Sequence, residues 1–221
     1  MGCVWRKAFR REECGCCSAS RQRHVVAYWS VFIAAAEGSG CREIVLPSLE
    51  PSRVYTERAG QEVLEQMYAF NVRGRELCLR PEATATCQLL AAGPLSRSGE
   101  TRVWYEVRCW RYETPQLGRY REFTQFGVEI LNPRARDLAR YREELIELAV
   151  RMIEPFAPDY ELDRSVKRGL AYYTNDGFEI STVRLGAQRQ LLGGGGYERG
   201  IGFAIGLDRL VLAAIQANAA S

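Results

Sequence analysis

Residues 101–131 have the sequence TRVWYEVRCWRYETPQLGRYREFTQFGVEIL. Apolar and polar residues alternate around Val103, Tyr105 and Val107, which is typical of a half-buried strand and predicts one over 101–112. A loop with proline and glycine follows at 114–118. Residues 122–131 then form a second extended segment of similar length. The whole stretch therefore predicts a long antiparallel hairpin with a wide loop, around which the rest of the chain can be placed.

The segments around this hairpin complete a sheet with helices against it. Helical spacing of apolar residues extends over 21–37 and 136–154, and a further helix is expected over 207–219. Short strands are predicted at 43–46 and 201–205, and two extended segments lie between 170 and 183. The pattern predicts an α+β fold in which a largely antiparallel sheet is flanked by helices. With 221 residues and 47% hydrophobic side chains, the chain suits one compact domain over 21–221, preceded by a poorly ordered arm over 1–20.

The cationic residues are strongly biased toward arginine. Of the 30 lysines and arginines, only Lys7 and Lys167 are lysine. A guanidinium group binds carboxylate or phosphate through two parallel hydrogen bonds, although a biased genome composition also explains arginines at the surface. The formal net charge of +3 gives no indication of nucleic-acid binding. The single histidine, His24, argues against a hydrolase built on a histidine base.

The eight cysteines fall into two sets. Four stand singly in apolar surroundings and are expected to be buried thiols of a reduced, cytoplasmic protein. The other four crowd the N-terminus, where no second ligand pair follows at zinc spacing, so no metal site is predicted. We also expect no membrane span and no secretory signal, because the chain has neither 18 consecutive apolar residues nor an apolar N-terminal segment. The two sets are Cys41, Cys78, Cys87 and Cys109, and Cys3, Cys14, Cys16 and Cys17.

The hairpin carries residues that suit a nucleotide. Arg111 and Glu113 are two positions apart and are expected on one face of the first strand. The same spacing places Arg121, Phe123 and Gln125 on one face of the second. Together they offer a cation for phosphate, a carboxylate for an exocyclic amine and an aromatic platform for a base. A salt-bridged surface hairpin is the alternative explanation, because charged hairpins are common.

Three other segments contain candidate residues. Residues 80–84 (RPEAT) place Glu82 in a first helical turn, where it either favours the helix dipole or receives an ammonium group. Residues 167–173 (KRGLAYY) combine two cations with paired tyrosines, which suits either strand packing or a phosphate and a polar ligand. Four glycines at 193–196 permit close approach of the backbone to a ligand. Arg209, in the first turn of the last helix, opposes the dipole and therefore favours a ligand role.

In this order, the four segments resemble those of the class II aminoacyl-tRNA synthetases, and specifically the histidyl-tRNA synthetases. Residues 79–85 (LRPEATA) are similar to that family's Leu-Arg-Pro-Glu-Gly-Thr-Ala, and 115–123 (PQLGRYREF) to its motif 2. Residues 168–173 (RGLAYY) resemble its Arg-Gly-Leu-Asp-Tyr-Tyr, and 202–209 its motif 3. The helix from residue 21 and the strand ending at residue 47 resemble motif 1, the element that forms dimers. The resemblance covers roughly residues 21–219.

The resemblance implies a catalytic core that activates histidine with ATP to the aminoacyl-adenylate and then transfers it to tRNA. It implies ATP and Mg²⁺ as ligands, a homodimer, and no protein ligands for a resident metal. Arg111, Arg168 and Arg209 would be catalytic, and Arg168 would stabilise negative charge at the α-phosphate. ATP would be bound by Arg111 at the α-phosphate, Glu113 at the adenine amine, Arg121 at the outer phosphates, and Phe123 and Arg209 on the two faces of adenine. The amino acid would be bound by Glu82, Thr84, Gln125, Glu129, Tyr172, Tyr173 and Tyr197.

The sequence also departs from the family. Ala171 replaces an aspartate and Ala83 a glycine, and residues 132–166 are too few for the usual insertion domain. No residues follow 221, so an anticodon-binding domain is expected to be absent. Three other functions stay open. They are the histidine-sensing, non-catalytic regulatory subunit of ATP phosphoribosyltransferase, an amino-acid-activating paralogue with another acceptor, and a truncated gene product without activity of its own.

Overall fold

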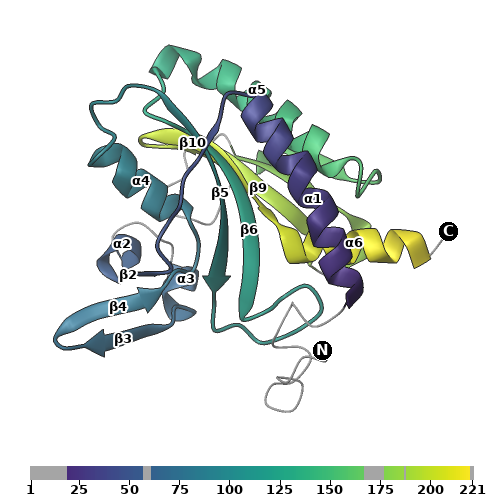
Figure 1. Ribbon diagram of the computed structural model, residues 1–221, viewed down its shortest axis with the longest axis horizontal. Coiled ribbons are helices and arrows are strands. Elements are labelled where there is room, and N and C mark those ends of the chain that lie inside the picture. The colour runs from purple at the N-terminus through teal and green to yellow at the C-terminus, as the bar shows by residue number, and fades with distance from the viewer. Residues whose placement is uncertain (1–18, 57–60, 167–176, 187, 220–221) are drawn as a thin grey trace.

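A computed structural model describes residues 19–56, 61–166, 177–186 and 188–219 (Figure 1). Six helices and ten strands are assigned within them, with short 3₁₀ turns at Ala135–Asp137 and Val183–Leu185. The helices are α1 (Ala19–Gly38), α2 (Arg53–Thr56), α3 (Gln61–Glu65), α4 (Thr84–Ala92), α5 (Leu138–Ile153) and α6 (Leu207–Ala219). The strands are β1 (Arg42–Glu43), β2 (Leu49–Pro51), β3 (Ala69–Val72), β4 (Arg75–Leu79), β5 (Thr101–Trp110), β6 (Glu122–Leu131), β7 (Glu161–Val166), β8 (Gly177–Ser181), β9 (Gln190–Tyr197) and β10 (Gly200–Gly206).

Seven strands form the main sheet in the order β1-β5-β6-β10-β9-β8-β7. Only the β1–β5 pair within it is parallel, and the described strands β2, β4 and β3 form a second, smaller sheet. The predicted α+β fold is therefore confirmed. The predicted hairpin is β5 and β6, paired from Thr101 opposite Leu131 to Trp110 opposite Glu122.

The first strand of the hairpin ends two residues earlier than predicted. Beyond Trp110, the amide of Tyr112 donates to the carbonyl of Gln66 at 2.7 Å, and the amide of Glu113 donates to the carbonyl of Arg111 at 2.8 Å. The amide of Arg111 still donates to the carbonyl of Arg121 at 2.9 Å, and the bond from Tyr112 then draws the chain away from its partner strand. Arg111 and Glu113 therefore lie in the loop and not on a strand.

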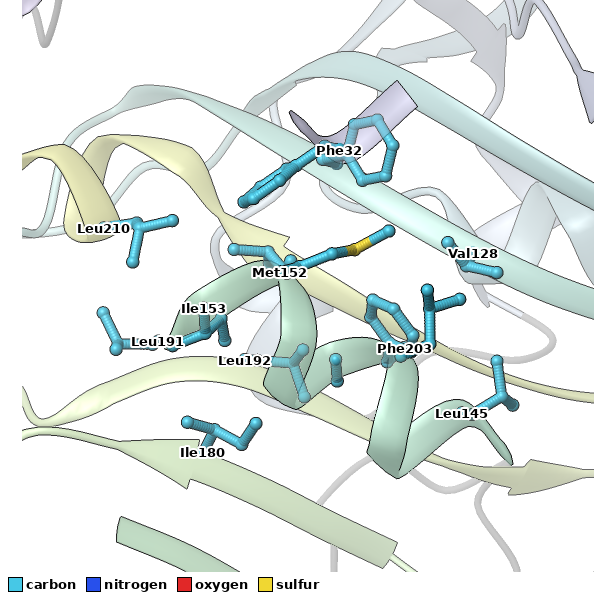
Figure 2. Packing of buried hydrophobic residues seen from close by; sticks show 14 of the residues in the cluster. Phe32, Val128, Leu145, Met152, Ile153, Ile180, Leu191, Leu192, Phe203 and Leu210 are labelled. Atoms are coloured by element: carbon cyan, nitrogen blue, oxygen red, sulfur yellow. The ribbon is translucent and has the colours of Figure 1, made fainter. Parts of the chain in front are cut away.

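One face of the sheet is covered by α1, α5 and α6 (Figure 1). Phe32 from α1 packs edge-on against Phe126 of β6, which stacks on Trp104 of β5 with ring centroids 5.5 Å apart. Figure 2 shows Met152 and Ile153 of α5 lying among leucine, isoleucine and phenylalanine side chains from the strands. Each such buried side chain contributes roughly 1.5–3 kcal/mol of hydrophobic free energy, which makes this cluster the main stabilising core.

The opposite face carries α4 and the small sheet (Figure 1). Val103, Tyr105, Val107 and Cys109 point to this side, because side chains in β5 alternate between the faces. The four singly placed cysteines are buried and free, as predicted. The N-terminal cysteines and most of the predicted arm lie outside the described residues. No helix within the described ranges is long and apolar enough to cross a membrane.

The four glycines at 193–196 lie inside β9 and pair with β10, with Gly194 opposite Phe203. A Cβ atom added at Gly194 would lie 2.3 Å from Cζ of Phe178 and 2.8 Å from the carbonyl oxygen of Gly202. Glycine is therefore required here by packing between β8, β9 and β10. Gly194 is thus a structural requirement of the sheet, whatever the run contributes to a ligand site.

We predict that Gly194→Ala lowers the free energy of unfolding by about 1–3 kcal/mol, because the methyl group overpacks the Phe178 ring. Urea denaturation followed by far-UV circular dichroism measures this change. Gly38→Ala is the matched control, since no atom lies within 4 Å of its added Cβ, and it should leave stability unchanged or raise it by up to ~1 kcal/mol. Equal stability of the two variants would contradict the packing argument.

Candidate functional site

Three charged side chains meet in the loop that joins β5 and β6. Nε of Arg119 lies 2.5 Å from Oε2 of Glu113, and Nη1 of Arg111 lies 4.0 Å from Oε1 of the same carboxylate. Arg111 is fixed further by its Nε, which donates to the carbonyl oxygen of Pro81 at 2.9 Å. Glu113 is buried, whereas both arginines stay part-exposed. The loop thus presents two cations held by one buried carboxylate.

Arg209 reaches this loop from the start of α6. Its Nε donates to the carbonyl oxygen of Gly118 at 2.8 Å, and its Nη1 donates to that of Gln190 at 3.2 Å. Burial lowers the pKa of this guanidinium, an effect that Glu113 opposes and that Arg111 and Arg119 reinforce. The four charges therefore act on one another, and Arg209 lies beside the loop; the ligand role expected for it stays a prediction.

Phe123 in β6 and Arg121 just before this strand point in two directions. The guanidinium carbon of Arg111 lies 5.3 Å from the ring centroid of Phe123, so Phe123 faces the charged group. The guanidinium of Arg121 instead stacks on the exposed ring of Tyr112 at 4.4 Å and donates from Nε to the carbonyl oxygen of Glu113. Arg121 is thus at the edge of the group, and Arg119 lies nearer its centre.

A second group surrounds Glu129, which is 1% exposed. Its carboxylate accepts hydrogen bonds from the hydroxyl of Tyr197 at 2.9 Å, and from those of Tyr105 and Thr84 at 3.3 Å each. Burial raises the pKa of Glu129 to about 8, because the charged form loses its hydration and Glu82 is close by, although the three hydroxyls oppose the shift. The buried group is therefore poised to change charge near neutral pH.

Glu82 lies next to this second group, and Gln125 lies four residues before Glu129 in the same strand. The Glu82 carboxylate accepts from the backbone amides of Thr84 at 2.6 Å and Ala85 at 2.9 Å, and so caps α4. Glu82 thus acts at the helix start, but it lies two residues before α4 begins at Thr84 and not in the first helical turn, where it had been predicted. Oε1 of Gln125 accepts from Sγ of Cys109 at 3.2 Å, which orients the amide along the same sheet face.

The two groups share the sheet face that carries α4. The pairing of β6, β10 and β9 places Gly127, Ala204 and Gly193 in one row across that face. A Cβ at Gly127 would overlap the ring of Tyr105, and one at Gly202 would lie 1.8 Å from Oε2 of Glu129. Small residues therefore make room for the polar side chains, and Gly193 and Ala204 stay part-exposed although their strands are central.

Three of the predicted site residues lie where the structure describes no residues, and two residues that belong to the site were not predicted from the sequence. Arg168, Tyr172 and Tyr173 lie outside the described residues. Arg119 and Tyr105 were not named as site residues, although Arg119 lies two positions before Arg121 and Tyr105 shares the inward face of β5. Within the described part of the chain, no group of three or more histidine, cysteine, aspartate or glutamate side chains could hold a metal ion.

Comparisons with known proteins bear on the fold and on the family of the chain. The family model for histidyl-tRNA synthetase matches residues 19–157. The histidine–tRNA ligase of Archaeoglobus fulgidus is 29% identical over 279 residues, which cover 79% of this chain and 68% of that protein. The apo histidyl-tRNA synthetase of S. aureus superposes with a TM-score of 0.77 at 21% identity, covering 95% of this chain and 70% of that one.

A structure described as an ATP phosphoribosyltransferase regulatory subunit/histidyl-tRNA synthetase, from Bacillus halodurans, superposes with a TM-score of 0.69 at 17% identity. It covers 88% of this chain and 79% of that chain. Sheet order, flanking helices and these likenesses define the fold as that of the class II aminoacyl-tRNA synthetases. The family model matches well over half of the sequence. The chain belongs to the histidyl-tRNA synthetase family.

We predict a pH-dependent contribution of Glu129 to stability. Because its pKa in the folded protein is about 8, against an ordinary value of 4.5, the folded state holds the proton more tightly than the unfolded state. This contribution is fully present below about pH 4.5 and is lost as the pH rises through about 8. Replacement by glutamine removes the titration, so Glu129→Gln should gain stability relative to the parent protein as the pH rises. Thermal unfolding at pH 5–9 measures the difference, and a constant difference would contradict the raised pKa.

Proposed function

We propose that this chain is an adenylate-forming catalytic domain that activates histidine with ATP, releasing pyrophosphate. The observation that carries the proposal is the assembly of Arg111, Arg119 and Arg209 around Glu113, beside the buried Glu129 group. Three guanidinium groups share a single carboxylate, so the group carries more positive than negative charge and is suited to an anion of several charges. The family model and the histidine–tRNA ligase names of the relatives support the choice of substrates.

In this proposal the ionised carboxylate of the amino acid attacks the α-phosphorus of ATP in line, and pyrophosphate leaves from the opposite side. No general base is needed, because the nucleophile already carries its charge. Arg111 contacts the α-phosphate, and Arg168 stabilises the charge that develops there. The protein contributes orientation and preorganised positive charge, which are the principal means of catalysis in phosphoryl and nucleotidyl transfer.

The remaining ATP contacts follow from the same arrangement. Glu113 accepts from the adenine amine, while Phe123 and Arg209 lie on the two faces of the base. Arg121 is proposed for the outer phosphates. We add Arg119, because its guanidinium pairs with the same Glu113 carboxylate that Arg111 faces. Mg²⁺ enters with ATP as part of the substrate. This fits the donor set, since Mg²⁺ is bound largely by phosphate oxygens and water with one or two carboxylates.

The amino acid is proposed to bind along the α4 face. Glu82 and Thr84 at the start of α4 receive the ammonium group, with Gln125 beside them. Glu129 binds the imidazole through its carboxyl group, supported by the Tyr197 hydroxyl at 2.9 Å. Tyr172 and Tyr173 complete the side-chain pocket in this proposal.

Transfer of histidine to a tRNA 3′ end and assembly as a cytoplasmic homodimer complete the proposal. We also propose that the chain lacks the insertion domain of the family. The alignment with the Archaeoglobus fulgidus relative supports this, because it runs over 279 residues but only 79% of this 221-residue chain. The relative therefore has internal residues that have no counterpart here.

The second candidate is a histidine-sensing regulatory subunit of ATP phosphoribosyltransferase. The likeness to the Bacillus halodurans structure favours it at the level of fold. The retained cations at the loop favour catalysis instead, since a sensor needs histidine contacts but no phosphate contacts. A paralogue with a different acceptor and an inactive gene fragment are the other candidates.

Amino-acid-dependent pyrophosphate–ATP exchange, run with each of the twenty amino acids, tests the proposed function. We expect exchange with histidine. Histidine binding by calorimetry without exchange would support the regulatory subunit, and exchange with another amino acid would support a paralogue. Neither exchange nor binding with any amino acid would contradict both leading candidates.

We predict that Arg111→Ala lowers the exchange rate by a factor on the order of 100 or more, because it removes a preorganised cation at the α-phosphate. Arg108→Ala is the matched control: Arg108 is exposed, pairs with the exposed Glu122 and should leave exchange nearly unchanged.

Arg168→Ala should abolish exchange with the fold intact by circular dichroism. Unchanged exchange in either variant would remove that arginine from the proposed mechanism.

A further inference from the structure

Arg80 has an unusual position for a cation, because its side chain lies almost wholly inside the protein. The residue is 1% exposed, at the junction between β4 and α4. Its Nε and Nη2 donate to the carbonyl oxygen of Arg108 at 3.2 and 3.0 Å, and its Nη1 donates to that of Pro47 at 2.5 Å. The guanidinium therefore links this junction to Arg108 near the end of β5 and to Pro47 in the segment before β2.

The charge that balances Arg80 comes from Glu50 in β2, which is 2% exposed. Oε1 of Glu50 lies 3.9 Å from Nη1 of Arg80. Both oxygens of the carboxylate also face the hydroxyl of Thr86 in α4, at 2.7 and 3.0 Å. Removal of one partner from such a buried ion pair lowers the stability of the protein, because the remaining charge is no longer compensated.

Tyr55 of α2 extends this set of buried polar groups to the main-chain carbonyl of Glu82. Its fully buried hydroxyl lies 3.1 Å from Oγ1 of Thr86 and donates to the backbone oxygen of Glu82 at 3.2 Å. Glu50, Tyr55, Arg80 and Thr86 thus form a continuous buried network behind residues 80–82. On the opposite side, the same short segment presents its groups to the candidate site.

The segment holds two parts of that site. The carbonyl of Pro81 accepts from Nε of Arg111 at 2.9 Å, and the Glu82 carboxylate accepts from the amides of Thr84 and Ala85. The backbone amide of Trp110 donates to the carbonyl of Arg80 at 2.9 Å, which links the segment to the end of β5. A small displacement of the 80–82 main chain would therefore move both Glu82 and Arg111.

We propose that Glu50, Tyr55 and Thr86 are positioning residues, which act through Arg80 and the 80–82 main chain to orient Glu82 and Arg111. None of the three contacts the loop cations, and all are buried. The proposal rests on the proposed function for its kinetic consequence alone. Groups that support substrate-binding side chains from behind affect activity strongly although they do not touch the substrate.

Thr86→Val tests the network, because valine keeps the shape of threonine and removes the hydroxyl between Glu50 and Tyr55. The KM for the activating amino acid in pyrophosphate exchange should rise by about tenfold, with a smaller change in the KM for ATP. Thr86→Ser restores a hydroxyl and should return the KM to within about twofold of the parent value. Tyr55→Phe should raise the amino-acid KM in the same way.

Tyr28→Phe is the matched control for loss of a buried tyrosine hydroxyl, since Tyr28 packs on Phe156 in the helical core. An unchanged amino-acid KM in Thr86→Val and Tyr55→Phe would overturn the proposal. The proposal would also be overturned if kcat, both KM values and the melting temperature all changed to the same extent and Tyr28→Phe showed the same changes.

Amide hydrogen exchange separates failure of this proposal from failure of the proposed function. The amides of Thr84 and Ala85 are bonded to the Glu82 carboxylate and should exchange about tenfold faster in Thr86→Val than in the parent or in Tyr28→Phe. This measurement needs no activity. If the parent protein shows no pyrophosphate exchange, the proposed function fails, and unchanged protection at these two amides would then overturn the positioning role.

Discussion

The pairing of β5 with β6 is the constraint on which the rest of the structure depends. Ten residues of each strand are paired without a shift, so every side chain is assigned to one of two faces. Trp104 and Phe126 go to the face under α1 and α5, while Tyr105 and Glu129 go to the face under α4. A shift by one residue would put the carboxylate in the apolar core and the aromatic rings in the site. Hydrophobic packing on one face therefore fixes the chemistry of the other.

This division explains how much could be predicted from the sequence. The strand over 122–131 and the last helix were predicted with the bounds observed, because local patterns of apolar residues determine them. The end of β5 at Trp110 was not, since it depends on a bond from Tyr112 to Gln66, a residue distant in sequence. Nor could the sequence place the glycines of β9 in a strand, because the need for Gly194 arises from Phe178 in the neighbouring strand.

The site residues show the same contrast. Glu113 and Arg209 were singled out by residue type and by resemblance, and the structure brings them together at the loop. Glu129 was singled out by resemblance alone, and it lies on the α4 face of β6. Arg119 was not, because alternation along a strand does not describe a loop in which it turns back to meet Glu113. Tyr105 was missed as well, since an inward tyrosine in a strand is indistinguishable from core until its hydroxyl is seen at Glu129.

The two ends of the site differ in how they are held, and this difference has a chemical consequence. The Glu129 group is buried and satisfied by hydroxyls, so its geometry is fixed by the fold itself. At the other end Arg119 pairs with the Glu113 carboxylate, while Arg111 and Arg209 donate to the main-chain carbonyls of Pro81 and Gly118. Neutral carbonyls orient a guanidinium without neutralising it. In the proposed function a polyphosphate joins these acceptors, and the positive charge of Arg111 and Arg209 that the carbonyls leave uncompensated is available to it.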